Sequence, residues 1–441
     1  MPPVPPIHDR EMADWHQFID GCRYEPAARS SLHDILDAVD RFAQAEVPTA
    51  TAQRWDRAGV TLDAARHRAV LPAGLGETLA KLRELGYFGV NLGEEFGGLA
   101  LPALAETLIV ERLSRQDPAL ALFLAVHYTA TTMIRTFGDE PQKTELLPAM
   151  SGSGARFLLG GLAYTEPGAG SSLGEAQCEA RPAQSARPAG PATLGGAETG
   201  PALSAPVALH GEKIFISSGG VADLYIVLAR EPGAELSTWL CRPYDDAGQA
   251  RSGFSIAKLE EKIRLHASPT AHLRFDGLPL PAGSRLGAAG RGLSNALVGL
   301  NSGRLGIAAQ ALGIAAAAFA EAYEYITSRR QFGRPVASFQ SVRFQMAELY
   351  GRIAAGRSLL LQAVQLKERG ERFRAMASIA KLHCSELAAA ITPICLQFCG
   401  GMGFMDEMSL GRHLGNAQVT TIYEGTSNMQ KLTLAKELFG D

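Results

Sequence analysis

The chain has 441 residues, of which 46% are hydrophobic and 20% charged, and its formal net charge is −3 at pH 7. This length predicts two or three domains with a sizeable core, and the small net charge argues against binding to nucleic acid or to a membrane surface. No basic stretch followed by an apolar run opens the sequence, and the apolar run at residues 119–126 is too short to span a bilayer. Six cysteines in a chain of this length do not form a disulfide framework, so we expect a cytoplasmic protein.

The first third of the chain is predicted to be mostly helical. Residues 1–30 begin with several prolines and are expected to form a loosely held arm, followed by a helical domain over residues 31–155. Residues 104–113 and 119–136 are predicted helices, as is the segment before Gly86, where leucines recur at helical spacing (Leu75, Leu79, Leu82 and Leu85). Residues 53–72 have no clean period and are expected to be an insertion or loop.

Over residues 156–288 the pattern changes to short apolar runs separated by Gly and Pro, which is typical of a β domain. The predicted strands are residues 213–217, 224–228, 238–241, 254–257 and 271–275. Residues 181–206 are almost entirely Ala, Pro, Gly and Ser, so we expect a flexible surface loop between two strands.

Residues 289–441 return to helical spacing, and many of the facing positions are Ala or Gly. Small residues on facing positions let long helices pack closely, which predicts a helix bundle. Cys395 and Cys399 lie one helical turn apart but have no further ligands at metal-site spacing, so we predict no metal site.

The segment Ile422-Tyr423-Glu424-Gly425-Thr426 places a carboxylate just before a predicted helix. Thr426 or Ser427 can serve as its N-cap, and Ser427 with Gln430 fits a capping box. Gly425 allows a tight turn that would point Glu424 into a cleft, where apolar surroundings could make it a general base. In isolation, a favourable charge near a helix N-terminus is the commoner explanation.

Four other segments carry chemistry only when they are combined. Residues 162–171 form a Gly-rich loop that offers N–H groups and hydroxyls to a polar ligand, and residues 213–217 form a strand with an aromatic face. Residues 329–335 end a helix with clustered guanidinium groups, and residues 397–403 end another with a Gly-rich turn. Each alone is also explained by a turn, a core strand, a basic helix end or a Gly C-cap.

Together and in this order, these motifs resemble the acyl-CoA dehydrogenase family of flavoproteins, from about residue 31 to the end of the chain. The resemblance implies an α+β fold with an N-terminal helical domain, a middle β-barrel-like domain and a C-terminal four-helix bundle. It also implies FAD as cofactor, bound between the β domain and the bundle.

The resemblance assigns cofactor contacts residue by residue. Residues that would line the flavin ring are Leu162, Tyr164, Thr165, Ser171, Phe215 and Ser217. Residues that would reach the FAD of a neighbouring subunit are Arg329, Phe332, Gln340, Gln397, Gly400 and Gly401. Thr426 and Asn428 match positions beside the flavin diphosphate, so the resemblance implies a homodimer or homotetramer.

The resemblance also implies the reaction. Glu424 matches the catalytic base, and an earlier position that holds the base in some relatives, residues 301–304, has no carboxylate here. Substrate contacts are implied for Ser171, Arg304, Tyr423 and Gly425. Glu424 would take the α-proton of an acyl-CoA while flavin N5 takes the β-hydride, and an electron-transfer flavoprotein would reoxidise the enzyme.

Two departures keep alternatives open. Ser172 stands where the family usually has Asp, and Gly415-Asn416 stands where it usually has Arg-Asp, which removes an expected ion pair near the Glu424 loop. Residues 260–270 are similar to a subgroup that acts on larger or unusual acyl-CoAs. A carrier-protein thioester as substrate, or a flavin-binding member with a non-dehydrogenase activity, therefore remain rival hypotheses.

Overall fold

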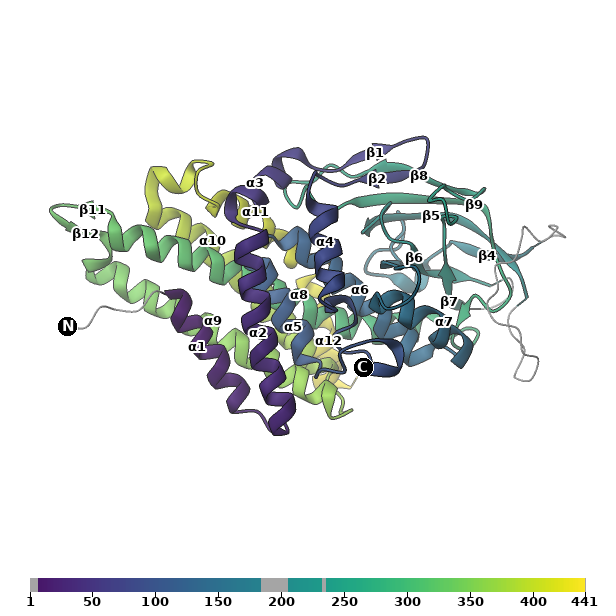
Figure 1. Cartoon of the computed structure of the whole chain (residues 1–441), viewed down its shortest axis with the longest axis horizontal. Helices are drawn as coiled ribbons and strands as arrows, with labels where there is room; N and C mark the ends of the chain where they lie inside the picture. The colour runs from purple at the N-terminus through teal and green to yellow at the C-terminus, as the bar shows by residue number, and fades with distance from the viewer. Residues whose placement is uncertain (1–6, 184–204, 232–234, 441) are drawn as a thin grey trace.

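The computed structural model describes residues 7–183, 205–231 and 235–440 (Figure 1). An N-terminal set of helices and a C-terminal set of long helices lie together, and a β domain lies at one end of the molecule. This order of helices, β domain and helix bundle confirms the predicted fold class.

The N-terminal third is built from helices α1 to α7. Their bounds are α1 (Ile7–Asp20), α2 (Pro26–Glu46), α3 (Thr49–Ala58), α4 (Leu75–Glu84), α5 (Leu104–Gln116), α6 (Pro118–Phe137) and α7 (Glu140–Ser151). Local caps explain two of the starts. Asp117 accepts a hydrogen bond from Leu120 N at 2.9 Å ahead of α6, and Asp139 with Gln142 forms a capping box ahead of α7.

The expected loose arm is wrong for residues 7–30. Helix α1 packs against α2, and its Trp15 and Ile19 side chains are fully buried. Pro26 occupies the first turn of α2, a position where proline favours helix initiation. The prediction was based on the early prolines, which come before helix α1 in the sequence. Residues 1–6 of the predicted arm lie outside the described residues.

Residues 53–72 are not the loop that was one of their two predicted forms, and the other form, an insertion, stays a prediction. The segment contains the end of α3 and a short antiparallel hairpin of β1 (Thr61–Asp63) and β2 (Arg68–Val70). Trp55 Nε1 donates to Ala73 O at 2.9 Å, and Ala69 N donates to Gly220 O at 3.0 Å in the β domain. These contacts come from residues outside the segment, so its own sequence does not show that it folds into a regular structure.

The β domain is an eight-stranded mixed sheet. Its strands are β3 (Gly160–Ala163), β4 (Glu179–Pro182), β5 (Val207–Ser217), β6 (Leu224–Arg230), β7 (Leu236–Cys241), β8 (Phe254–Leu259), β9 (Thr270–Leu280) and β10 (Arg285–Leu286). The strand order is β10-β7-β6-β4-β5-β9-β8, and β3 pairs in parallel with β6. All five predicted strands are confirmed, whereas most of the predicted loop at 181–206 lies outside the described residues.

The C-terminal helices form the predicted bundle. They are α8 (Gly292–Ser328), α9 (Gln340–Glu368), α10 (Arg374–Cys399), α11 (Leu410–Thr420) and α12 (Ser427–Phe439), and the short hairpin of β11 (Arg330–Gln331) and β12 (Arg334–Pro335) follows α8. Glycines allow close helix contacts, since a Cβ at Gly313 of α8 would lie 2.3 Å from Glu111 O of α5. This agrees with the prediction made from the small facing residues.

Among the residues that the structure describes, two helical stretches are long and apolar enough to cross a membrane by length and composition. These are α8, of whose most apolar window 83% is buried within the molecule, and residues 374–404, of whose window 39% is buried. Helix α8 is the central helix of the bundle, because it packs against α5, α6, α9, α10 and α11. Its hydropathy is therefore that of a core helix.

Candidate active site

The Glu424 loop joins α11 to α12 and has an unusual backbone. Glu424 has φ 53° and Gly425 has φ 92°, so two successive residues lie in the left-handed region, which is unfavourable for a side chain such as Glu. Thr426 is the N-cap of α12, since its Oγ1 accepts from Met429 N at 3.3 Å. The expected capping box of Ser427 and Gln430 is not formed, because the Gln430 amide instead donates to Gly425 O at 2.8 Å.

The carboxylate of Glu424 lies against the backbone of α8. A Cβ at Gly303 would lie 2.5 Å from Glu424 Oε2, so only a glycine leaves room for the carboxylate there. Oε2 is buried and has no hydrogen-bond partner among the described residues. Burial raises the pKa of Glu424 to about 7, although the positive charges of Arg304 and Lys381 oppose that rise.

Two cations flank Glu424 and are themselves fixed by hydrogen bonds. Lys381 Nζ donates to Gly425 O at 2.8 Å, which ties the loop to α10. Arg304 Nη1 donates to Asn301 Oδ1 at 2.8 Å and to Ser378 Oγ at 3.1 Å. Burial lowers the pKa of Lys381 to about 8 and that of Arg304 to about 10, with the negative charge of Glu424 acting in the opposite direction.

Tyr423 and Gly425, two predicted substrate contacts, lie in this same loop as Glu424 and beside Arg304. The Tyr423 hydroxyl donates to Gln310 Oε1 on α8. The loop is therefore attached to α8 through Tyr423 and to α10 through Gly425.

The Gly-rich loop at residues 162–171 is fixed by a buried ion pair. Lys213 Nζ on β5 lies 2.7 Å from Glu166 Oε1 and donates to Tyr164 O at 2.9 Å. Glu166 also accepts from Gln177 N at 2.6 Å and from Cys178 N at 2.9 Å. This set of bonds holds the loop in one conformation at the ends of β3 and β5.

This loop lies near the Glu424 carboxylate. Burial raises the pKa of Tyr164, and the charge of Glu424 raises it further. Phe215 has φ 56° at a break in the β5 register, and its side chain is 61% exposed. Thr165, Leu162 and Ser217 are half-buried and Ser171 is exposed, so every predicted flavin-ring residue except the buried Tyr164 reaches the molecular surface at least in part.

A second group of predicted residues is not brought to the Gly-rich loop. Arg329 directly precedes the β11–β12 hairpin, Phe332 lies in its turn and Gln340 follows it, at the opposite end of the molecule from the β domain (Figure 1). Phe332 is 92% exposed, and Gln397, Gly400 and Gly401 are exposed at the end of α10. Thr426 and the exposed Asn428 begin α12, next to the Glu424 loop.

Arg264 lies against Gly415, the position where the family usually has an arginine. A Cβ at Gly415 would lie 2.3 Å from the Arg264 Cγ atom, and Arg264 Nη1 lies 3.5 Å from Asp56 Oδ2. Asn416 is buried beneath it. Arg264 of the β domain thus packs against α11 at Gly415, where the side chains of the usual Arg-Asp pair are missing.

Sequence reasoning missed Lys381, Gly303, Arg264 and the Glu166–Lys213 pair. Lys381 had one available signal, a lysine inside a helix whose neighbours are mostly apolar, because such a lysine needs a buried partner. The other three are explained by contacts between residues far apart in the chain.

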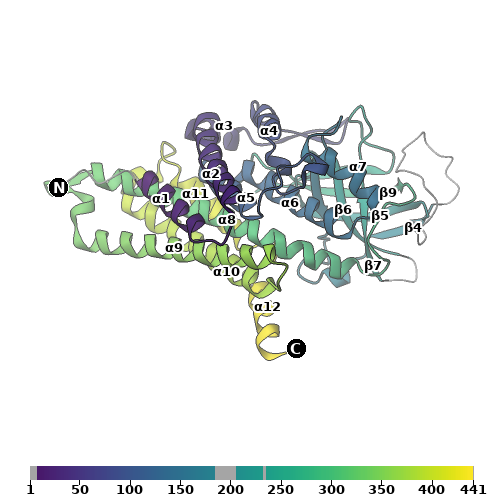
Figure 2. The same ribbon diagram turned by 60° about the horizontal axis from the view of Figure 1, so that its bottom comes forward.

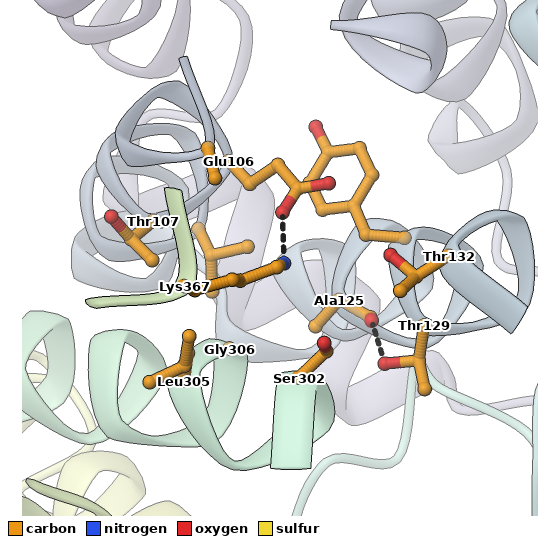
Figure 3. Close-up of a pocket in the computed structure, with 12 residues that line it drawn as sticks. Glu106, Thr107, Ala125, Thr129, Thr132, Ser302, Leu305, Gly306 and Lys367 are labelled. Atoms are coloured by element: carbon orange, nitrogen blue, oxygen red, sulfur yellow. Dashed lines mark hydrogen bonds and ion pairs between the residues drawn. The ribbon is translucent and has the colours of Figure 1, made fainter. Parts of the chain in front are cut away.

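A small cavity lies near Gly303, the residue that the Glu424 carboxylate approaches (Figure 3). It lies between α5, α6 and α8, and Lys367 of α9 reaches it. Ser302, beside Gly303, and Thr129, whose Oγ1 would lie 3.3 Å from a Cβ at Gly303, are among its lining residues. The cavity is therefore close to the Glu424 carboxylate, with Gly303 between them.

Comparison with known proteins agrees with this architecture. Family models for the acyl-CoA dehydrogenase N-terminal, middle and C-terminal domains match residues 30–153, 161–278 and 290–439. An acyl-CoA dehydrogenase of Bacillus subtilis (strain 168) is 35% identical over 369 residues, covering 82% of this chain and 90% of that protein.

Two solved structures are similar over nearly the whole chain. A chain in the structure of the electron transferring flavoprotein of Acidaminococcus fermentans has 30% identity and a TM-score of 0.81, covering 93% of this chain and 98% of that one. A glutaryl-CoA dehydrogenase of Mycobacterium smegmatis in complex with FADH2 has 26% identity and a TM-score of 0.78, covering 95% and 96%. The chain therefore belongs to the acyl-CoA dehydrogenase family, whose members use FAD.

Proposed function

We propose that the protein catalyses FAD-dependent α,β-dehydrogenation of an acyl-CoA thioester, with Glu424 as the base that removes the α-proton. One observation carries the proposal: Glu424 sits in a left-handed turn with a buried, unpartnered Oε2 in the described structure and a pKa near 7. A base with this pKa is half deprotonated at neutral pH and can both take and release a proton.

The residues present fit FAD as the cofactor. Phe215 is exposed and Thr165 half-buried, as side chains that contact a bound ring require, and the buried Tyr164 hydroxyl has no partner within the described residues. When bound, FAD supplies the acceptor for the β-hydride. The chain supplies the rest: the Glu166–Lys213 pair fixes the loop that would hold the flavin, and Glu424 would receive the proton.

Burial favours the protonated form of Glu424, and the positive charges of Arg304 and Lys381 favour its ionised form. The two effects together bring the pKa of Glu424 close to neutrality. We further propose that the backbone N–H of Glu424 donates to the thioester oxygen as negative charge develops.

Glu424→Gln tests this role. The variant should retain FAD and its unfolding midpoint, and anaerobic bleaching of the flavin by acyl-CoA should slow by a factor of about 10²–10⁴. Glu348→Gln, on the exposed surface of α9, is the matched carboxylate-to-amide control and should bleach at the wild-type rate. Bleaching of Glu424→Gln at the wild-type rate would reject Glu424 as the base.

We further propose a homo-oligomer, because one chain leaves much apolar surface exposed around the second group of predicted cofactor contacts. These exposed side chains are Phe332, Phe344, Met402, Phe404 and Met405. Arg329, Gln340, Gln397, Gly400 and Gly401 would then contact the FAD of a neighbouring subunit. Light scattering at micromolar concentration should give at least a dimer.

Arg329→Ala sharpens this proposal, since it should weaken FAD retention during dialysis through loss of a charged contact with the cofactor. Arg330→Ala, at the neighbouring exposed position, is the control. A monomeric protein that keeps all its FAD in the Arg329→Ala variant would reject a shared site.

An electron-transfer flavoprotein is the proposed electron acceptor, supported by the similarity to a chain in such a protein's structure. All six cysteines are buried and free in the described structure, which supports a reducing, cytoplasmic location.

A further inference from the structure

The cavity near Glu424 is lined by charged and hydroxyl side chains as well as by apolar ones. Its lining includes the carboxylate of Glu106, the ammonium of Lys367 and the hydroxyls of Thr129, Thr132 and Ser302. Figure 3 shows Glu106 and Lys367 pointing toward each other, with Thr129 and Ser302 toward the other side of the cavity.

The acidic and basic groups are buried yet incompletely satisfied. Glu106 is 7% exposed, and its Oε2 lies 3.4 Å from Lys367 Nζ. Glu106 Oε1 and Thr132 Oγ1 are buried and have no partner in the part of the chain that the structure describes. A buried acceptor without a donor costs free energy, so these atoms call for a hydrogen-bonding occupant.

The cavity lies close to Glu424, so part of a substrate is one candidate for that occupant. Gly303 separates the cavity-lining Ser302 and Thr129 from the Glu424 carboxylate. If Glu424 takes a proton from the α-carbon, the carbons beyond the β-carbon can extend past Gly303 toward Glu106 and Lys367.

We propose that the enzyme acts on acyl thioesters whose tail carries a hydroxyl group, which binds between Glu106 and Lys367. This inference rests on the proposed dehydrogenase function and specifies its substrate class. A hydroxyl donates one hydrogen bond, to Glu106 Oε1, and accepts another, from Lys367 Nζ, so it satisfies both partners at once.

Other tails fit this pair less well. An ammonium group would face Lys367, a carboxylate would face Glu106, and each meets a like charge at short range. An apolar tail would displace any water from the pair and leave Glu106 Oε1 without a donor.

The pair can be altered without removing the helix junction beside it. The adjacent Glu368 accepts from Leu104 N at 3.0 Å and from Tyr24 OH at 2.7 Å, and so anchors the end of α9 to the start of α5. Glu106→Leu/Lys367→Met removes both charges together and avoids leaving one buried charge alone.

The test measures binding to the FAD-loaded Glu424→Gln protein by calorimetry, which does not require turnover. The ligands are four-, five- and six-carbon acyl-CoAs, each with a methyl, hydroxyl, amino or carboxyl terminus. In at least one length the hydroxyl compound should bind about tenfold more tightly than the methyl compound, because hydrogen bonds to charged groups are strong. Glu106→Leu/Lys367→Met should abolish that preference.

Glu46→Leu/Lys81→Met is the matched control, since it removes an exposed acid–lysine pair joined at 2.6 Å between α2 and α4 and should leave the preference intact. If the double variant does not fold, Glu106→Gln provides the same comparison with the smallest change in shape. Equal binding of hydroxyl and methyl tails, or a preference for a charged tail, would overturn the inference. Flavin bleaching of the wild-type protein by these thioesters separates this outcome from failure of the dehydrogenase function, in which no thioester bleaches the flavin.

Discussion

The two loops that face each other in the candidate active site contain carboxylates in opposite situations. Glu166, in the β-domain loop, accepts bonds from Lys213, Gln177 and Cys178 and has both oxygens satisfied. Glu424, in the bundle loop, has a buried Oε2 without a partner in the described residues and a strained backbone. The first carboxylate fixes structure, and the second remains available for a proton.

This difference shows how one site can combine rigidity with reactivity. Hydrogen bonds to an ionised carboxylate lower its basicity, whereas burial without donors raises it. A fully satisfied Glu166 positions the surface proposed for the flavin, and an unsatisfied Glu424 can exchange a proton near neutral pH. Removing a partner of Glu166 should therefore weaken the structure of the site, whereas disturbing Glu424 should slow the proton transfer.

The largest expected effect comes from breaking the rigid side with Lys213→Met. Glu166 would then remain buried without its cation, and loss of one partner of a buried pair typically costs about 3–5 kcal/mol. We expect a lower free energy of unfolding and loss of FAD on dialysis. Lys258→Met, at an exposed pair with Glu260 in the same domain, should leave both unchanged. A stable Lys213→Met variant that keeps FAD would show that the pair does not fix the loop.

The reactive side can be disturbed through the backbone of α8. In Gly303→Ala the new methyl group would meet Glu424 Oε2 at 2.5 Å and displace the carboxylate. A misplacement of about 1 Å can reduce the rate about 10²-fold, so flavin reduction should slow by that order. Gly351→Ala is the control, because it lies within helix α9 and has open space around it. Equal flavin-reduction rates in the two variants would contradict the contact between Gly303 and the base.

The smallest expected effect comes from removing the positive charge of Lys381 beside Glu424. Lys381→Met removes a cation that lowers the pKa of Glu424, so that pKa should rise above its value of about 7. Because the base acts in its deprotonated form, the flavin-reduction rate increases as pH passes upward through this pKa, and the whole profile should move to higher pH. Lys381→Arg should restore the profile, and the exposed Lys431→Met should not move it. A profile unchanged in Lys381→Met would show that the cation acts only through its bond to Gly425 O.

Local patterns in the sequence were sufficient for the domain order, five strands and the main bundle helices. They failed where distant contacts decide the structure, as in the β1–β2 hairpin tied to Gly220. In the site, the sequence predicted Glu424 and its left-handed neighbour Gly425. It could not reveal that Gly303 leaves space for the carboxylate, or that Arg264 covers Gly415, because each contact joins residues more than a hundred positions apart.

Helix α12 begins immediately after the Glu424 loop and projects from the body of the molecule (Figure 2). Its buried residues are Gln430 and Thr433, whereas Leu438 and Phe439 are each 79% exposed. In the proposed assembly a neighbouring chain covers this helix and thereby steadies the turn that carries the base. The orientation of the Glu424 side chain then depends on subunit association, and association depends on protein concentration. Dilution should therefore lower the activity before the individual chains unfold.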